Sequence, residues 1–273
     1  MHNLSDRDFA EHNMSYIETT VVNDHILEIK INRPDKHNAL SPDMYQDLGQ
    51  ALAMLDQNPE LRVGVIYAEG RNFTSGIELD KWAPVFATGE GLPLSDEIID
   101  PFSLKGRRCR KPVVIAVQGY CYTWGVELLL NTEIRVAADD TQFAMLEVKR
   151  GIYPCGGATL RLPQQMGWSN AQRYLLTGDS WSASEAHRLG LIQEVVPSGE
   201  QYKKAREIAD KVAKAAPLGV QAILKSSRFA ALEGEHEAIK HLFKDLIPIM
   251  NSADAKEGVS SFLQRREAIF KGR

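Results

Sequence analysis

The chain has 273 residues, of which 44% are hydrophobic and 25% are charged, and this fits one globular domain with a sizeable core. A formal net charge of −4 gives no reason to expect nucleic acid or an anionic membrane as a partner. The three cysteines, Cys109, Cys121 and Cys155, cannot all pair and show no metal-ligand spacing. We therefore expect no metal site and reduced thiols in a cytoplasmic protein.

The N-terminal part of the chain predicts an extension, a hairpin and a helix. Residues 1–14 lack a basic region followed by an apolar core, so we expect a flexible extension rather than a secretory signal. Residues 16–22 and 25–31 are rich in β-branched residues on either side of Asn23 and Asp24, which predicts a hairpin. Ser41 and Pro42 predict the N-cap and first residue of a helix with apolar positions at helical spacing.

The remainder of the chain alternates between predicted strands and helices or loops, and its last part is predicted to be helical. Strands predicted at residues 63–69, 112–118 and 134–139, separated by helix or loop, indicate an α/β layered core over residues 15–200. Residues 82–104 are rich in Pro and Gly and are expected to be irregular. From Trp168 onward the pattern is nearly all helical, with a capping box at Ser182 and Glu185 and a stop at Gly190. Residues 201–273 are expected to form a C-terminal helical region.

The stretch IAVQGYCYTWGVELLL, residues 115–130, carries the most chemistry. A buried strand passes through Gly119 into a turn and a short helix that begins at Trp124 and contains Glu127. Polar and glycine interruptions argue against a membrane span. A helix start stabilises a developing negative charge, and a carboxylate one turn inside can move protons beside it. The stretch therefore predicts an oxyanion site with its own acid or base.

Five segments together resemble the crotonase superfamily of enoyl-CoA hydratases and isomerases. They are INRPDKHNAL, GRNFTSGIELDKW, IAVQGYCYTWGVELL, LEVKRGIYPCGGATLRL and SADAKEGVSSFLQRREAIFKGR. The resemblance covers most of residues 16–273 in the family's order. It implies a crotonase-like spiral of ββα units with a C-terminal helical trimerisation region. The implied assembly is a homotrimer or a dimer of trimers.

The resemblance also implies a set of site residues. The two backbone N–H groups that bind the thioester oxygen fall on Ile77 and Trp124, and the two hydratase glutamates fall on Glu127 and Glu147. The substrate-binding positions implied beside them are Ser75, Gly76 and Gly125 at the oxyanion donors, Trp82 at the acyl-pocket wall, Pro154 and Gly156 in the pocket loop, and Arg33 and Lys36 near the phosphates of coenzyme A. Thr123 and Trp124 stand where the family usually has glycines, and Glu78 replaces a common aspartate.

The function implied is reversible hydration of a 2-enoyl-CoA, with coenzyme A as part of the substrate and no separate cofactor. In the resembled hydratases, the residue at Glu127 activates water and that at Glu147 delivers the proton. The alternatives are an enoyl- or dienoyl-CoA isomerase and a non-catalytic or RNA-binding protein on the same scaffold. The resembled dienoyl-CoA isomerases place a further acid at the position of Cys155, and its absence favours hydration.

For two of these residues the sequence also allows a structural role in place of a role in the site. Glu147 precedes Lys149 and Arg150 and could be an exposed ion-pair partner rather than a proton donor. The indole of Trp124 is expected to fill part of the acyl pocket, and the alternative is that it packs in the core.

Overall fold

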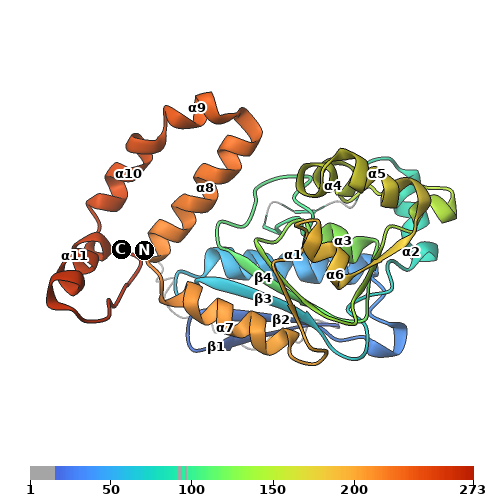
Figure 1. The fold of residues 1–273 in the computed structure, drawn as a ribbon, viewed down its shortest axis with the longest axis horizontal. Coiled ribbons are helices and arrows are strands. Elements are labelled where there is room, and N and C mark those ends of the chain that lie inside the picture. Colours follow the sequence, from blue (N-terminus) through green and yellow to red (C-terminus); the bar gives the residue numbers. More distant parts are fainter. Residues whose placement is uncertain (1–15, 92–93, 96) are drawn as a thin grey trace, which may run out of the picture.

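The computed structural model describes residues 16–91, 94–95 and 97–273 (Figure 1). The extension expected at residues 1–14 lies outside the described residues. The main sheet has six strands in the order β1-β2-β3-β4-β6-β9. Their bounds are β1 Ile17–Val22, β2 Ile26–Ile31, β3 Val63–Ala68, β4 Val113–Val117, β6 Ile134–Ala138 and β9 Glu194–Val196. The β1–β2 pair is antiparallel and the others are parallel, so the expected α/β class and hairpin are confirmed.

The helices connect these strands or follow them. They are α1 Pro42–Gln57, α2 Leu79–Ala87, α3 Trp124–Leu129, α4 Ala158–Met166, α5 Trp168–Thr177, α6 Ala183–Arg188, α7 Gln201–Lys214, α8 Pro217–Glu233, α9 Glu235–Ile239, α10 Leu242–Met250 and α11 Ala253–Gln264, with 3-10 turns η1 Pro34–Lys36 and η2 Glu147–Arg150. Ser41 caps α1 as predicted, because its side chain accepts a hydrogen bond from the Met44 N–H at 3.3 Å.

The main sheet is covered on both faces. Alternate strand residues such as Val65 and Val114 contact an alanine stripe on α7, made of Ala205, Ala209 and Ala213. The opposite residues, such as Ile66 and Ile115, join the larger core with α1 and α3. Figure 1 shows α7 below the sheet and α1, α3 and α6 above it, whereas α8 to α11 extend away from it. The predicted boundary between residues 200 and 201 stays a prediction.

Several short strands escaped the sequence-based prediction. A second sheet contains β5 Tyr120–Tyr122, β7 Gln142–Ala144 and β8 Ser180–Ser182 in the order β5-β7-β8. Two strands lie after Trp168: β8 in this second sheet, and β9 at the edge of the main sheet. The expectation of a nearly all-helical chain after Trp168 is therefore wrong in part. Strands of three residues show too little alternation to be recognised, and these are defined by long-range pairing.

Two local expectations also need correction. Residues 82–87 belong to α2 rather than to an irregular segment. The capping box at α6 is only half formed, because Ser182 accepts from the Glu185 N–H but the Glu185 carboxylate binds Arg188 and Tyr174 instead of reaching back. A strong cationic partner one turn later competes successfully for that carboxylate.

Candidate active site

A short parallel β-bridge between Leu40 and Ile77 sets the direction in which the Ile77 N–H group points. Leu40 donates to the Gly76 carbonyl at 2.8 Å and accepts from the Glu78 N–H at 3.0 Å. In a parallel pairing, the residue between those two partners points its own N–H to the other side. Within the described part of the chain, the Ile77 N–H has no hydrogen-bond acceptor. It is therefore available to a ligand.

The second expected donor, Trp124, is the first residue of α3. Its N–H also lacks an acceptor among the described residues, because the first bonds of this helix run from Val126 and Glu127 to the Thr123 carbonyl. The two donor segments touch each other: a Cβ on Gly76 would lie 2.7 Å from Oγ1 of Thr123. Gly76 has φ +121°, so both its conformation and its close packing require glycine.

Thr123 adopts a backbone conformation that is unusual for a β-branched residue. Its φ is 50° and its ψ is −112°, a region that glycine occupies far more readily. The Thr123 side chain packs over Gly76, and its buried Oγ1 finds no partner among the described residues. Strain at this level typically costs about 1–3 kcal/mol, and it falls on the turn that sets the Trp124 N–H.

The indole of Trp124 is part of the core. Trp124 is 2% exposed and packs beside Phe73, with ring centroids 6.3 Å apart. This matches the alternative that the indole packs in the core, rather than the expectation that it fills part of the acyl pocket. Gly125, the next residue, lies so close to Thr74 and Cys121 that a Cβ would collide with their side chains. The start of α3 is thus pressed against the segment that carries the first donor.

The carboxyl group of Glu127 is buried and oriented by backbone donors. Its Oε1 accepts from the N–H groups of Gly156 at 2.7 Å and Ala158 at 3.2 Å, at the start of α4. A Cβ on Gly156 would collide with Oε2, so only glycine fits beside this carboxyl group. Burial raises the pKa of Glu127 to about 8, and the nearby charge of Glu147 adds to the rise. The two N–H donors favour the ionised form, but burial outweighs them.

Glu147 lies at the start of η2 and is 8% exposed. Burial raises its pKa to about 7. Its Oε2 is buried without a partner in the described part of the chain, and neighbouring Lys149 approaches Asp179 instead. The exposed ion-pair alternative for Glu147 is therefore wrong. Two coupled carboxyl groups with raised pKa values form a pair that can hold and move protons near neutral pH.

Tyr45 and Asp100 join this site although sequence reasoning missed them. The Tyr45 hydroxyl donates to Asp100, and the pKa of Tyr45 is raised by burial and by the charges of Asp100 and Glu127. Tyr45 also contacts the rings of Trp82 and Phe102, and Phe102 lies against Gly156. Tyr45 and Asp100 are 55 positions apart in the sequence, so no local pattern reveals this contact.

The remaining predicted binding residues have these positions. Arg33 is buried against Glu78, while Lys36 is exposed in η1. Ser75 donates its N–H to the His37 carbonyl, and the Trp82 indole donates to the Leu40 carbonyl at 2.9 Å. Pro154 is buried in the loop before Gly156. None of these contacts by itself tests binding of coenzyme A, so those roles stay predictions.

The architecture agrees with the comparisons to known proteins. The sequence model described as enoyl-CoA hydratase/isomerase matches residues 22–273. The chain belongs to the enoyl-CoA hydratase/isomerase family. A crystal structure of a "probable enoyl-CoA hydratase/isomerase" from Mycobacterium abscessus is 41% identical, with a TM-score of 0.91 over 96% of this chain and 100% of that one. The crotonase fold expected from the sequence is thus confirmed.

Other family members of similar length are also related. Enoyl-CoA hydratase EchA19 of Mycobacterium tuberculosis is 38% identical over 252 residues, which are 91% of this chain and 94% of the relative. (E)-benzylidenesuccinyl-CoA hydratase of Thauera aromatica is 32% identical, over 93% of this chain and 98% of the relative. The structure of enoyl-CoA hydratase EchA1 from Mycobacterium marinum is 32% identical, with a TM-score of 0.85 over 94% of this chain and 99% of that chain.

Other features of the described residues bear on the earlier expectations. No helix in this part of the chain is long and apolar enough to cross a membrane. All three cysteines lie in the described ranges and are free, with Cys109 and Cys121 buried and Cys155 exposed. Burial first, and then the charges of Glu127 and Glu147, raise the pKa of the Cys155 thiol to about 11. The thiol near the glutamates is therefore protonated at neutral pH.

The raised pKa values predict a pH-dependent stability. In the unfolded chain these carboxyl groups ionise near pH 4.5, whereas in the folded protein Glu127 keeps its proton until about pH 8. The folded state therefore binds more protons between these values, and its stability falls as pH rises from about 4.5 to about 8. The Glu127→Gln variant lacks this titration, so its stability should gain roughly 4 kcal/mol relative to the natural protein between pH 5 and pH 8.5.

Urea unfolding at both pH values measures this difference, with Glu200→Gln as a control for replacing an exposed carboxylate. A pH-independent difference between the natural protein and Glu127→Gln would contradict the buried, protonated state of Glu127.

Proposed function

We propose that this protein reversibly adds water to a 2-enoyl-CoA to give a 3-hydroxyacyl-CoA. The observation that carries the proposal is the pair of buried carboxyl groups, Glu127 and Glu147, whose pKa values are raised to about 8 and 7. Addition of water needs one group that accepts a proton from water and another that supplies a proton to the α-carbon. A pair titrating near neutral pH can provide one ionised and one protonated member at once.

The thioester is activated through its carbonyl oxygen in this proposal. The N–H groups of Ile77 and Trp124 donate to that oxygen and stabilise the enolate that forms as water adds to the β-carbon. Both groups lack acceptors in the described part of the chain, and their segments pack together through Gly76 and Thr123. Loss of one such donor typically costs about a hundred- to a thousandfold in rate.

The two glutamates then have distinct tasks. In the singly protonated form of the pair, the proposal places the proton on Glu147, and the two backbone N–H groups on one oxygen of Glu127 favour its ionised form. Glu127 then takes a proton from the attacking water through its other oxygen. Glu147 delivers a proton to the α-carbon, and its unpartnered Oε2 suits that task. The water oxygen bonds to the β-carbon, and the electron pair of the double bond ends in the new α C–H bond.

Isomerisation of an enoyl-CoA is the rival activity in the same family. It would need the site to move a proton from one carbon to another without adding water. At the position where the resembled dienoyl-CoA isomerases have a further acid, this chain has Cys155, whose pKa is about 11. A thiol this weakly acidic is a poor substitute for a carboxylate that must exchange protons at neutral pH. Hydration therefore remains the preferred function.

Replacing either glutamate tests the proposal. Glu127→Gln and Glu147→Gln should each lower hydration by at least about a hundredfold, because each removes proton transfer and leaves the oxyanion donors in place. The measurement is loss of the conjugated absorbance for a panel of enoyl-CoAs of different chain length. Affinity for a saturated acyl-CoA should change little.

Glu200→Gln is the matched control, since Glu200 is exposed at the start of α7. Near-normal turnover of every thioester by Glu127→Gln or Glu147→Gln would remove that residue from the mechanism.

We also propose that the chain assembles as a homotrimer or a dimer of trimers. Helix α10 exposes an apolar set consisting of Leu242, Phe243, Leu246, Ile247 and Met250. A contiguous apolar surface on a projecting helix favours contact with another subunit. Light scattering at micromolar concentration should report a mass about three or six times that of the chain. A stable monomer there would contradict the assembly.

A further inference from the structure

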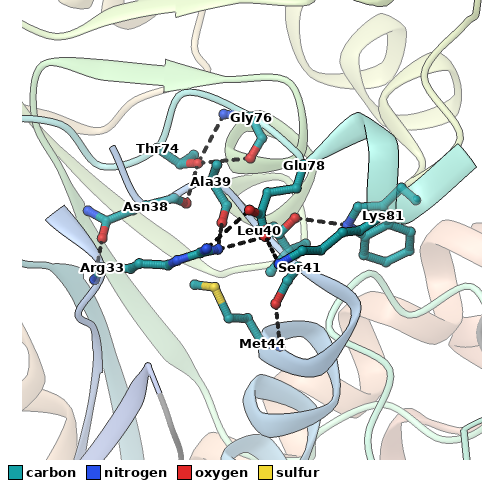
Figure 2. Close-up of polar contacts among 11 residues, drawn as sticks. Arg33, Asn38, Ala39, Leu40, Ser41, Met44, Thr74, Gly76, Glu78 and Lys81 are labelled. Carbon is teal, nitrogen blue, oxygen red and sulfur yellow. Dashed lines mark hydrogen bonds and ion pairs between the residues drawn. The ribbon is translucent and has the colours of Figure 1, made fainter. Parts of the chain in front are cut away.

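The position of the Ile77 N–H depends on how firmly its neighbours are held. The Leu40 bridge fixes the backbone on both sides of Ile77, and the Thr74 hydroxyl donates to the Asn38 carbonyl at 2.8 Å one step earlier. These contacts tie residues 38–40 to residues 74–78. Figure 2 shows the two segments side by side, with the side chain of Arg33 reaching across to Glu78.

Arg33 joins three pieces of the structure. It lies just beyond the end of β2, and its guanidinium donates to both carboxylate oxygens of Glu78, at 2.7 and 3.1 Å, and to the Ala39 carbonyl at 3.3 Å. Glu78 directly follows Ile77 and precedes the first residue of α2. One planar side chain therefore links the end of the main sheet, the Leu40 segment and the residue after the donor (Figure 2).

The chemistry of this pair suits a fixed support. A bidentate arginine–carboxylate contact fixes both the distance between the two groups and their relative orientation, whereas a single point charge does not fix the orientation. Arg33 is 8% exposed, so the contact is screened from solvent more than a surface pair. Hydrogen bonds from Arg33 hold the pKa of Glu78 down at about 2, so the carboxylate stays ionised at any pH where the protein works.

We propose that the Arg33–Glu78 ion pair is a positioning element that fixes the Ile77 N–H for the thioester oxygen, and that Arg33 does not bind a phosphate of coenzyme A. The proposal rests on the proposed function, because it assumes that Ile77 donates to the thioester. The contacts with Glu78 and Ala39 use three of the five N–H groups of Arg33, and its side chain is 9% exposed. A phosphate that took the two N–H groups directed at Glu78 would leave that carboxylate without its main partner.

The test compares Arg33→Lys and Glu78→Gln with the natural protein, using butanoyl-CoA labelled with carbon-13 at the thioester carbonyl. This saturated thioester cannot be hydrated, so infrared difference spectra report hydrogen bonding to its carbonyl without any reaction. Binding to the natural protein should lower the carbonyl stretching frequency. Arg33→Lys keeps the positive charge but loses the bidentate contact, and Glu78→Gln removes the negative charge. Each variant should therefore lose about half or more of that lowering.

Two further measurements separate positioning from phosphate binding. The kcat for hydration should fall at least about tenfold in both variants, because a misplaced donor weakens the contact to the thioester oxygen, and this contact counts most in the transition state, where that oxygen carries the most charge. Affinity for free coenzyme A, measured by calorimetry, should stay within about twofold. If Arg33→Lys fails to fold, Glu78→Gln makes the same prediction alone.

Two variants serve as controls. Lys81 is the exposed second partner of Glu78, and its Nζ lies 2.9 Å from Oε2 of Glu78. Lys81→Met removes this partner and leaves the bidentate contact with Arg33 intact. Arg188→Lys breaks a comparable bidentate contact with Glu185 on α6. Neither should change the carbonyl frequency.

The outcomes are distinguishable. A lowered frequency in the natural protein that persists in Arg33→Lys and Glu78→Gln would overturn the positioning role alone, as would a large loss of affinity for free coenzyme A with the lowering retained. No lowering in the natural protein would overturn the proposed oxyanion site and, with it, this inference.

Discussion

Burial of the Glu127 carboxyl group is the constraint on which the site depends. A carboxyl group taken out of water is tolerated only if it is protonated or supplied with donors, and Glu127 has both a raised pKa and two backbone N–H groups. Those donors come from Gly156 in the loop before α4 and from Ala158 at the start of that helix, so the loop must approach closely and must carry glycine at position 156. One buried acid thereby holds a loop and a helix start in place.

The two proposed oxyanion donors depend on a different feature, because they are backbone groups that their surroundings leave without an acceptor. A parallel bridge turns the Ile77 N–H away from Leu40, and a strained Thr123 sets the start of α3. Side chains at these positions can vary as long as the backbone path is kept. At Trp124, for example, the indole packs beside Phe73 in the core, and the N–H remains without an acceptor among the described residues.

Local patterns predicted much of this from the sequence. Ser41, the β1–β2 hairpin and the central strands each have a signal within a few residues, and Glu127 stands out as an acid inside an apolar helix. The partners that decide the chemistry are long-range. Nothing near Tyr45 indicates Asp100, and nothing near Arg33 indicates that Glu78 lies 2.7 Å from its guanidinium. The backbone strain at Thr123 and the three-residue strands also arise only once the chain is folded.

The central claim is that the coupled glutamates add water to an activated thioester, and oxygen-18-enriched water tests it most directly. The protein is incubated with a 2-enoyl-CoA in that water, and the products are analysed by mass spectrometry. The account predicts a 3-hydroxyacyl-CoA that carries oxygen-18 in its new hydroxyl group. Consumption of the substrate to a rearranged enoyl-CoA without incorporation of oxygen-18 would contradict it.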